Sequence, residues 1–181
     1  MPDAAHHITG YQFSAADKLF FDANVWLFIY SPQYRPSDQR AGLYSAAYKR
    51  ILEVQCRIFV DALILSEFVN VLARLAFHSL PSPQKPQDYK AFRRSPAFKP
   101  VARSIADACR RIVEACTRIE SGFASVDVDV LLERYEGGKA DFNDQILAQL
   151  CNRQGLTLVT DDGDFRDSGL QIVTANRRLL T

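Results

Sequence analysis

Short apolar runs alternate with longer segments of helical periodicity along most of this chain. The runs occupy residues 18–22, 57–60, 156–160 and 170–174, and a further one is expected near 122–126. Runs of this length, rich in Phe, Ile, Val and Leu, are typical of buried strands. Strands that alternate with helices form a parallel sheet with helices on both faces. The sequence therefore predicts an α/β fold of three α/β/α layers with a central, mostly parallel sheet.

The segments between these runs carry apolar residues at the three- and four-residue spacing of amphipathic helices. Helices are predicted within residues 24–30, 38–55, 62–79, 101–119, 129–135 and 141–153. In the third of these, Ser66 is the expected N-cap, which places Glu67 at the start of the helix.

The chain has 181 residues, a length typical of one domain. We expect residues 1–17 to form a partly ordered arm and residues 18–181 to form a single domain. Residues 80–100 contain five prolines and several basic residues but only one acid, Asp88, which predicts a loop-like excursion. The net charge of +1 produces no global field that favours or opposes nucleic acid, so a basic contact surface must be local.

Cysteine and histidine placement argues against a disulfide framework or a zinc site. The four cysteines, Cys56, Cys109, Cys116 and Cys151, form no CxxC pair, and the three histidines show no ligand spacing. No apolar run reaches the ~18 residues of a membrane helix. The N-terminus lacks the charged and apolar regions of a signal peptide. We therefore expect a soluble, cytoplasmic protein with reduced thiols and no membrane contact.

Acidic residues gather where the predicted strands end and where helices begin. Asp22 ends the first strand, while Glu67 and Asp144 lie near helix starts. Asp162 belongs to an acidic turn at residues 161–164, directly after the 156–160 strand. Because sites in parallel sheets lie beyond the carboxyl ends of the strands, we expect these acids to converge at one rim.

Carboxylates brought together repel one another, and this raises their pKa values unless a cation neutralises them. A cluster of Asp and Glu without His or Cys suits Mg²⁺ or Mn²⁺. Such ions activate water and offset charge on a leaving oxygen, so hydrolysis of a phosphodiester is the natural chemistry.

Each acid also has a purely structural explanation. A loop position accounts for Asp22, and a favourable interaction with the helix dipole accounts for Glu67. Asp141 suits a helix N-cap, with Asp144 three residues later. The acids at 161–164 suit a turn around a glycine, although three acids exceed what a turn requires. The metal-site prediction therefore depends on the joint placement of the acids.

Four short motifs occur in order between Leu19 and Val173. They are Phe20-Phe-Asp22-Ala-Asn24-Val-Trp, Ser66-Glu67-Phe, Asn143-Asp144-Gln-Ile-Leu-Ala148 and Val159-Thr160-Asp-Asp162-Gly-Asp164-Phe165. Together they resemble the motifs of PIN domains, notably the VapC-like toxin ribonucleases. The resemblance implies cleavage of single-stranded RNA by metal-activated water, with Mg²⁺ or Mn²⁺ held by Asp22, Glu67, Asp144 and Asp162.

The same resemblance implies supporting roles for four neighbours of these acids. The Thr160 hydroxyl would lie near Asp22, Asn24 would orient the first loop, and Asp164 would help the acids or brace their loop. Asp141 has no firm counterpart and is either a cap or an additional acid. VapC-like toxins also imply a cognate antitoxin. Apolar helix surfaces near 25–30 and 43–54 would serve an antitoxin peptide or a homodimer.

The proline-rich excursion is longer than simple VapC-like toxins imply. Basic and aromatic residues alternate through it: Lys85, Tyr89, Lys90, Phe92, Arg93, Arg94, Phe98, Lys99 and Arg103. An RNA-contacting surface would use basic groups to hold phosphates and aromatic rings to stack on bases. A solvated loop that keeps the protein in solution accounts for the same residues equally well.

Two other functions compete with the ribonuclease. A HAD-type phosphatase also places acids at strand ends, but it needs a second Asp where this chain has Asn24, and it leaves Glu67 unexplained. A PIN fold that binds RNA or protein without cutting is the second alternative. The presence of all four acids argues against it.

Overall fold

The computed structural model describes residues 5–31, 38–138 and 140–180, and within them six parallel strands form one sheet. The strands are β1 (Ala5–His7), β2 (Lys18–Phe21), β3 (Arg57–Val60), β4 (Thr117–Arg118), β5 (Thr157–Val159) and β6 (Ile172–Thr174). Their order across the sheet is β1-β6-β5-β2-β3-β4. The predicted three-layer α/β/α fold with a parallel sheet is confirmed.

Seven α-helices are found in the described ranges. They are α1 (Ala23–Tyr30), α2 (Arg40–Glu53), α3 (Ala62–His78), α4 (Tyr89–Arg94), α5 (Phe98–Ala115), α6 (Val128–Glu136) and α7 (Phe142–Gln154). The crossovers β2 to β3 and β3 to β4 step in one direction across the sheet, while α6 and α7 lead back from β4 to β5. Right-handed crossovers in opposite directions place their helices on opposite faces, which produces the outer layers.

Strands β2 and β5 are neighbours at the centre of the sheet, yet the chain leaves them in opposite directions. After β2 it runs towards β3 on one side, and after β5 it runs towards β6 on the other. This reversal opens a crevice outside the carboxyl ends of the two strands, which is where ligands bind in open α/β sheets.

The central strands are buried on both faces. Leu19, Phe20 and Phe21 of β2 are at most 1% exposed, although successive side chains of a strand point to opposite faces. All three residues of β5 and of β6 are also buried. Covering both faces with helices explains why these strands appear in the sequence as continuous apolar runs.

The N-terminal segment departs from the expected arm. Ala5–His7 pairs in parallel with β6 as an edge strand, and Ile8 is buried in the core. The Arg50 guanidinium donates a hydrogen bond of 2.6 Å to the Ile8 carbonyl, which ties the segment to α2. Edge pairing through the backbone needs no apolar run, so the sequence pattern gave no indication of it. Residues 1–4 lie outside the described part of the chain.

The strand expected near residues 122–126 is wrong. The strand that follows α5 is the two-residue β4, which pairs with β3, and the Ile119 amide continues this pairing to the Val60 carbonyl. Gly122 then takes a left-handed conformation with φ of 70°, and a 3-10 turn, η2 (Phe123–Ser125), follows. A residue in that conformation ends extended pairing.

Helix α3 begins earlier than predicted. Asp61 is its N-cap, with a side-chain oxygen that accepts from the Ile64 amide at 3.0 Å, so the expected Ser66 cap is wrong. Glu67 consequently lies in the second turn of α3, and the explanation of this residue by the helix dipole loses its basis.

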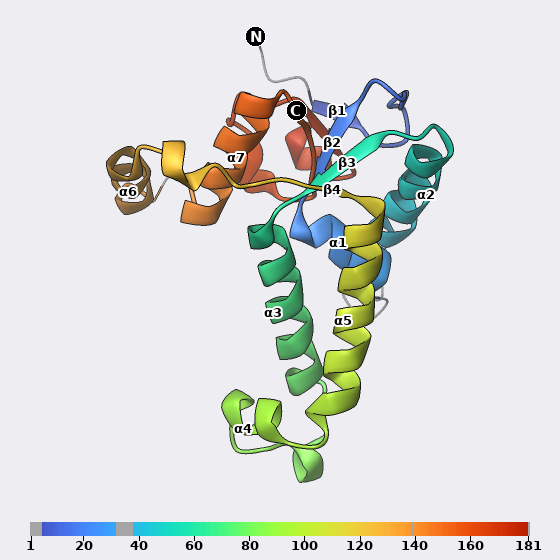
Figure 1. Cartoon of the computed structure of the whole chain (residues 1–181), viewed down its shortest axis with the longest axis vertical. Helices are drawn as coiled ribbons and strands as arrows, with labels where there is room; N and C mark the ends of the chain where they lie inside the picture. The colour runs from blue at the N-terminus through green and yellow to red at the C-terminus, as the bar shows by residue number, and fades with distance from the viewer. Residues whose placement is uncertain (1–4, 32–37, 139, 181) are drawn as a thin grey trace.

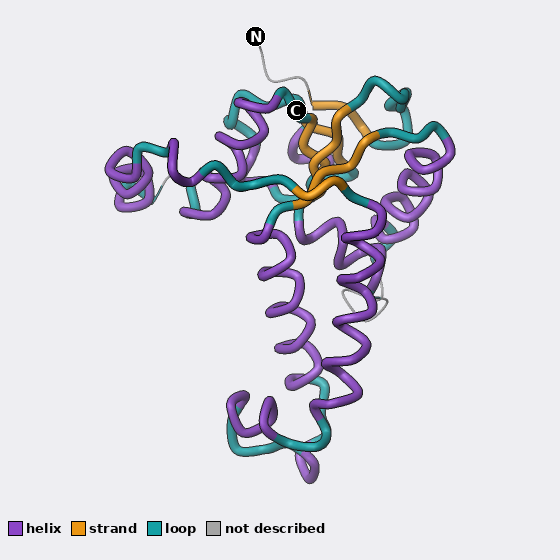
Figure 2. The backbone as a smooth tube through the Cα atoms, in the orientation of Figure 1, coloured by secondary structure: helices purple, strands orange, loops and turns teal. Residues whose placement is uncertain are grey.

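Helices α3 and α5 run side by side away from the sheet and carry α4 at their far end (Figure 1). Most of the region expected to be a loop is therefore helical, as the tube in Figure 2 shows, with the 3-10 turn η1 (Ser82–Gln84) before α4. We call residues 77–99 the hairpin tip.

The hairpin tip has a small aromatic core of its own. Phe92 is fully buried, and its ring centre lies 5.7 Å from that of Phe77 and 5.2 Å from that of Phe98. Tyr89 lies edge-on to Phe77 at 5.9 Å. The expectation that these rings are free to stack on RNA bases is wrong for Phe92, because the ring is used for packing.

The four cysteines are free, and burial raises the pKa of the Cys116 and Cys151 thiols to about 12. In the ranges that the structure describes, none of the helices combines the length and the apolar character needed to cross a membrane.

Candidate metal centre

The four predicted acids line one cavity at the crevice between β2 and β5. Asp22, Glu67, Asp144 and Asp162 border a space of about 220 Å³, together with Asn24 and residues of α1 and α3. They come from four different segments: the end of β2, α3, α7 and the loop after β5. The reversal of chain direction beside β2 explains why segments distant in the sequence meet there.

Asp22 is the most deeply buried of the acids that line the cavity, with 5% of its surface exposed. Its amide donates to the Val159 carbonyl at 3.0 Å, which continues the pairing of β2 with β5. One carboxylate oxygen accepts from the Thr160 hydroxyl and from the Asn24 amide, both at 2.6 Å. These two donors fix the orientation of the side chain at the border of the cavity.

Asn24 and Thr160 tie the ends of β2 and β5 together. The Asn24 amide nitrogen also lies 3.3 Å from the Thr160 hydroxyl, and its carbonyl oxygen accepts from the Asp161 amide at 3.1 Å. Thr160 is fully buried and its hydroxyl accepts from the Asp162 amide at 3.0 Å. These two residues therefore position both Asp22 and the loop that carries Asp162.

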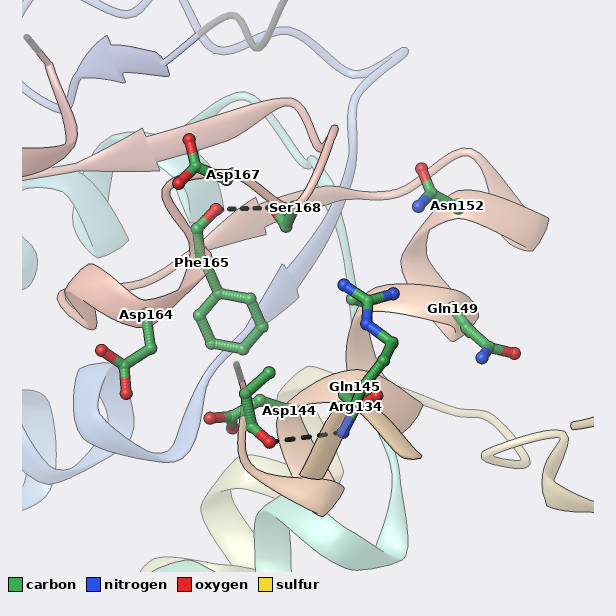
Figure 3. Close-up of a pocket in the computed structure, with 11 residues that line it drawn as sticks. Arg134, Asp144, Gln145, Gln149, Asn152, Asp164, Phe165, Asp167 and Ser168 are labelled. Atoms are coloured by element: carbon green, nitrogen blue, oxygen red, sulfur yellow. Dashed lines mark hydrogen bonds between the residues drawn. The ribbon is translucent and has the colours of Figure 1, made fainter. Parts of the chain in front are cut away.

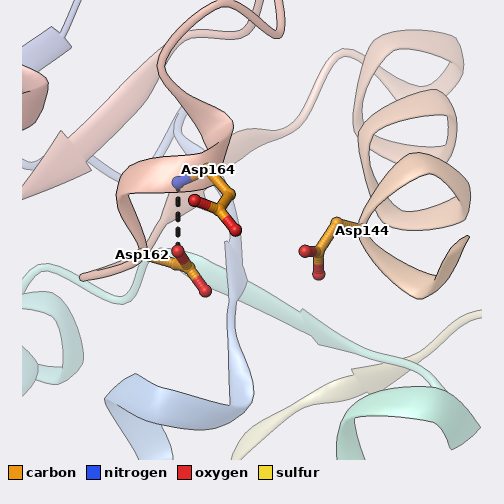
Figure 4. Close-up of side chains that lie close together, drawn as sticks. All are labelled: Asp144, Asp162 and Asp164. Carbon is orange, nitrogen blue, oxygen red and sulfur yellow. Dashed lines mark hydrogen bonds between the residues drawn. The ribbon is translucent and has the colours of Figure 1, made fainter. Parts of the chain in front are cut away.

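Asp144, Asp162 and Asp164 form the tightest group of acids. Each offers a carboxylate oxygen, and the three oxygens lie within 4.8 Å of one another. Figure 4 shows Asp162 and Asp164 on the loop after β5, facing Asp144 on α7. Asp162 also accepts from the Asp164 amide at 3.0 Å and so begins the 3-10 turn η3 (Gly163–Phe165). Asp164 was expected to assist the other acids, and it lies close enough to Asp144 and Asp162 for the three carboxylates to bind one ion.

Glu67 and Asp141 lie at the outer side of the cavity. Glu67 is solvent-exposed on α3 and lines the cavity beside Asp162. Asp141 occupies the N-cap position of α7, but its side chain makes no capping hydrogen bond to that helix. It lines a neighbouring groove with Glu67 and Asp144. Asp141 therefore contributes negative charge at this side of the cavity and no capping hydrogen bond.

The pKa values of the inner acids are raised. Burial is the main cause for Asp22, whose pKa rises to about 7, with the Thr160 hydrogen bond opposing the shift and the charges of Glu67 and Asp162 adding to it. Burial and then the charge of Asp22 raise the pKa of Asp144 to about 7. Loss of water contact and the charges of Asp162 and Asp141 also raise the pKa of Glu67. Such carboxylates gain from a bound cation.

Asp161 also lines the cavity, but its carboxylate is engaged by two side chains of α2. Its carboxylate pairs with Arg40 at 2.5 Å and accepts from the Tyr44 hydroxyl at 3.0 Å. Both partners lie on α2, more than one hundred residues away in the sequence, so sequence reasoning missed them. Tyr44 also donates to the Thr160 carbonyl at 3.0 Å. These contacts hold the loop after β5 against α2 and leave Asp162 to face the cavity.

A second cavity of about 400 Å³ adjoins the acids between α7 and the loop after β5. Asp144 and Asp164 lie at its border, and Phe165 stands within it (Figure 3). The Phe165 carbonyl accepts from the Ser168 hydroxyl at 2.6 Å. Arg134 from α6 also lines this cavity, which places a cation near the acids on the side away from α3.

The predicted RNA-binding residues lie apart from the acids. Lys90, Arg93 and Arg94 are exposed on α4, and Lys99 is exposed at the start of α5. All four therefore belong to the hairpin tip, at the far end of α3 from Glu67 (Figure 1). The Arg93 guanidinium lies 5.9 Å from the centre of the Phe98 ring.

Comparisons with known proteins bear on this arrangement. The family model "PIN domain" matches residues 19–169, a range that contains every acid of the cavity. Among solved structures, "Crystal structure of PAE2754 from Pyrobaculum aerophilum" matches with a TM-score of 0.49 and 17% identity, over 94% of this chain and 92% of that chain. None of the curated proteins matches the chain.

Proposed function

The chain belongs to the PIN domain family, and on that premise we propose that it is a metal-dependent endoribonuclease acting on single-stranded RNA. PIN domains are generally metal-dependent nucleases. The observation that carries the proposal is the convergence of Asp22, Glu67, Asp144 and Asp162 on one cavity at the β2–β5 crevice. The family match gives no support to a HAD-type phosphatase. Such a phosphatase needs an Asp at position 24, where this chain has Asn24, whose side-chain amide donates to Asp22.

The side chains fit Mg²⁺ or Mn²⁺. All the groups offered are carboxylates, which hard divalent cations prefer, and three of their oxygens lie within 4.8 Å of one another. The raised pKa values of Asp22 and Asp144 reflect burial first and neighbouring like charges second, and a bound cation offsets both. A bound ion supplies activation of water and stabilisation of the charge that develops on the phosphate.

We assign the metal-holding role to Asp22, Glu67, Asp144 and Asp162, with Asp164 as a further ligand. Thr160 and Asn24 keep the Asp22 carboxylate in one orientation through their hydrogen bonds. Loss of such a supporting contact typically lowers metal affinity or activity about 10-fold to 100-fold. Asp141 adds negative charge at the outer edge of the site.

Cleavage of RNA with Asp22→Asn as the matched variant tests the proposal. The wild-type protein should cleave single-stranded RNA with Mg²⁺ or Mn²⁺, lose activity in EDTA and recover it when metal returns. Asp22→Asn keeps the shape of the side chain but removes its charge. Cleavage that persists in EDTA, or that the variant retains in full, contradicts the proposal. RNA binding without any cleavage favours the non-catalytic module instead.

We propose that the basic residues of the hairpin tip, Lys90, Arg93, Arg94 and Lys99, contact RNA phosphates. Their exposure on α4 and α5 supports this role. Replacing both Arg93 and Arg94 by Gln should reduce the slope of log affinity against log salt by about 1.4, at about 0.7 per lost phosphate contact on a single strand. An unchanged slope contradicts the contact.

We further propose a toxin of the VapC-like type that acts in the cytoplasm, is inhibited by an antitoxin and forms a homodimer. Its support is the order of the four acid motifs and the apolar surface of α2, where Leu52 is 47% exposed. Expression in a bacterium should arrest growth, whereas Asp22→Asn should not. Growth that continues with active protein contradicts the toxin role, and a monomeric mass in solution contradicts the dimer.

A further inference from the structure

A groove of about 580 Å³ continues from the acidic cavity along the exposed side of α3. Glu67, Asp144 and Asp162 border both spaces, so the groove and the cavity adjoin at these acids. The groove is also lined by Arg74 of α3 and by Tyr135 near the end of α6. Among the described residues that line it, Arg74 is the one basic side chain beside the acids.

Arg74 is placed to continue the line that begins at Glu67. It follows Glu67 by seven residues on α3, which is about two helical turns and about 10.5 Å along the axis. Residues seven apart lie on the same side of a helix, and both line the groove. Helix α3 leads from the sheet towards the hairpin tip (Figure 1), and within this helix Arg74 follows Glu67 and precedes the first residue of the tip, Phe77.

The Arg74 side chain is exposed but held in place. Its guanidinium lies 5.1 Å from the centre of the Tyr89 ring of α4. Within the described ranges, Arg74 forms no ion pair with a carboxylate. A guanidinium stacked on a ring keeps all of its N–H donors for a partner, and its planar fork matches the oxygens of a phosphate.

Tyr135 provides a second kind of contact in the same groove. Among the described residues it is the most exposed large apolar side chain, at 54%, although Leu131 of the same helix is fully buried. An exposed ring beside a phosphate-binding groove suits stacking on an unpaired base, which does not depend on base identity. A base within a duplex is already stacked, so the groove favours a single strand.

We infer that this groove holds a single strand of RNA on one side of the cleavage point, with a phosphate at Arg74 and a base on Tyr135. The inference rests on the proposed ribonuclease function and adds two residues to it. The scissile phosphate lies at the acids, the next part of the strand lies along α3, and the hairpin tip holds the more distant phosphates. Arg74 and Tyr135 position the substrate and take no part in bond cleavage.

The test compares Arg74→Gln with Arg57→Gln. Arg57 is an exposed cation at the amino end of β3, outside the groove and the acidic cavity, so its replacement is a matched loss of charge that leaves cleavage unchanged. The substrates are an RNA of about 12 nucleotides, within the usual range of single-strand sites, and a dinucleotide that fills only the acids. Arg74→Gln should raise KM for the longer RNA about 5-fold to 10-fold and shrink the preference for it over the dinucleotide by the same factor.

Binding to the longer RNA gives an independent readout when it is measured in Asp22→Asn protein, which does not cut the RNA. Arg74→Gln should lower the slope of log affinity against log salt by about 0.7, the contribution of one phosphate on a single strand. Arg74→Lys should restore that slope, because it retains the charge. A purely structural role for Arg74 at the Tyr89 ring would not change the salt dependence.

Tyr135→Ala should weaken binding of the longer RNA about 10-fold, as expected for loss of one stacked base, whereas Tyr135→Phe should retain it. If the wild-type protein cleaves RNA but Arg74→Gln and Tyr135→Ala behave as Arg57→Gln does, the groove inference is overturned and the proposed function stands. If the wild-type protein cleaves neither substrate, the proposed function is overturned together with the inference that rests on it.

Discussion

At the sheet end of α3, carboxylates from four separate segments face one small cavity, whereas at its far end basic side chains surround aromatic rings that are close together in the sequence. The acids are partly removed from water, and the pKa values of Asp22 and Asp144 rise to about 7. The basic residues of the tip are exposed. The acidic cavity therefore concentrates like charges in a space with little water, whereas the hairpin tip spreads its basic charges over a packed aromatic core.

This difference predicts that the acidic end limits the stability of the metal-free protein and that the hairpin tip does not. Asp22 is held by Thr160, which is 138 residues away in the sequence, so the site forms only when the whole sheet has formed. The tip holds Phe92 between rings within fifteen residues of it. We expect a cation to stabilise the acidic end, and we expect the tip to be stabilised by its own packing.

The largest expected effect comes from Asp144→Asn, which should lower the activity and raise the stability of the metal-free protein. Asp144→Asn should reduce cleavage at least about 100-fold, because several kcal/mol of charge stabilisation is lost with a metal ligand. In EDTA the same variant should increase the free energy of unfolding by about 1–2 kcal/mol, since a buried like charge is removed. Rate measurements and urea denaturation check the two changes.

Asp107→Asn is the control for Asp144→Asn. Asp107 is an exposed acid of α5 that pairs with Arg110, and an exposed pair contributes little. Its replacement should change neither rate nor stability by more than about 0.5 kcal/mol. If Asp144→Asn destabilises the metal-free protein, the description of the acidic end as a region of unfavourable charge is wrong.

The second effect tests whether the tip is a packed unit. Phe92→Ala should lower the free energy of unfolding by about 3 kcal/mol, because a fully buried ring leaves a cavity among Phe77 and Phe98. Phe123→Ala, at a ring that is 49% exposed, should cost less than about 1 kcal/mol. Equal losses from the two variants would show that the tip makes no cooperative contribution to the fold.

The third effect concerns the bonds that hold Asp22. Thr160→Val removes the hydroxyl that donates to Asp22 and accepts from the Asp162 amide, with nearly the same volume. It should raise the Mn²⁺ concentration needed for half-maximal activity about 10-fold to 100-fold. Thr160→Ser retains the hydroxyl and should shift that concentration far less. The same metal requirement in all three proteins would contradict the positioning role.

The smallest effect is a dependence of metal-free stability on pH. Asp22 and Asp144 have folded pKa values of about 7, above the ordinary 3.8, so the folded protein holds protons that the unfolded chain releases. The contribution of these two groups to the free energy of unfolding is therefore fully present below pH 3.8. It falls as the pH rises and is lost above a pH of about 7.

Unfolding in EDTA should show a free energy of unfolding that falls as pH rises between these two limits, because the folded state binds more protons than the unfolded chain there. Added Mg²⁺ should stabilise the protein more at pH 8 than at pH 6, since the ion competes with protons for the same oxygens. Asp22→Asn should reduce the slope. A stability that rises with pH in EDTA would contradict the pKa directions.

The sequence predicted the parts of the fold that carry a continuous apolar signal. Strands β2, β3, β5 and β6 coincide with the apolar runs, and the acids after them followed from the rule for parallel sheets. Strands β1 and β4 were missed because their residues, Ala5–His7 and Thr117–Arg118, are mostly polar and pair only through the backbone at the sheet edges. Ser66 was expected as the cap of α3, whereas the structure uses Asp61, directly after β3, as the cap.

Within the site, the sequence alone determined which residue types were available and in what order: an acid after β2, one on α3, one at the start of α7 and three after β5. The tertiary structure decided their use. It gave Asp161 to Arg40 and Tyr44, turned Asp162 and Asp164 towards Asp144, and placed Arg74 in the groove that leaves the acids. The role of each carboxylate depends on the groups within a few ångströms of it. Only folding brings those groups together from distant parts of the chain.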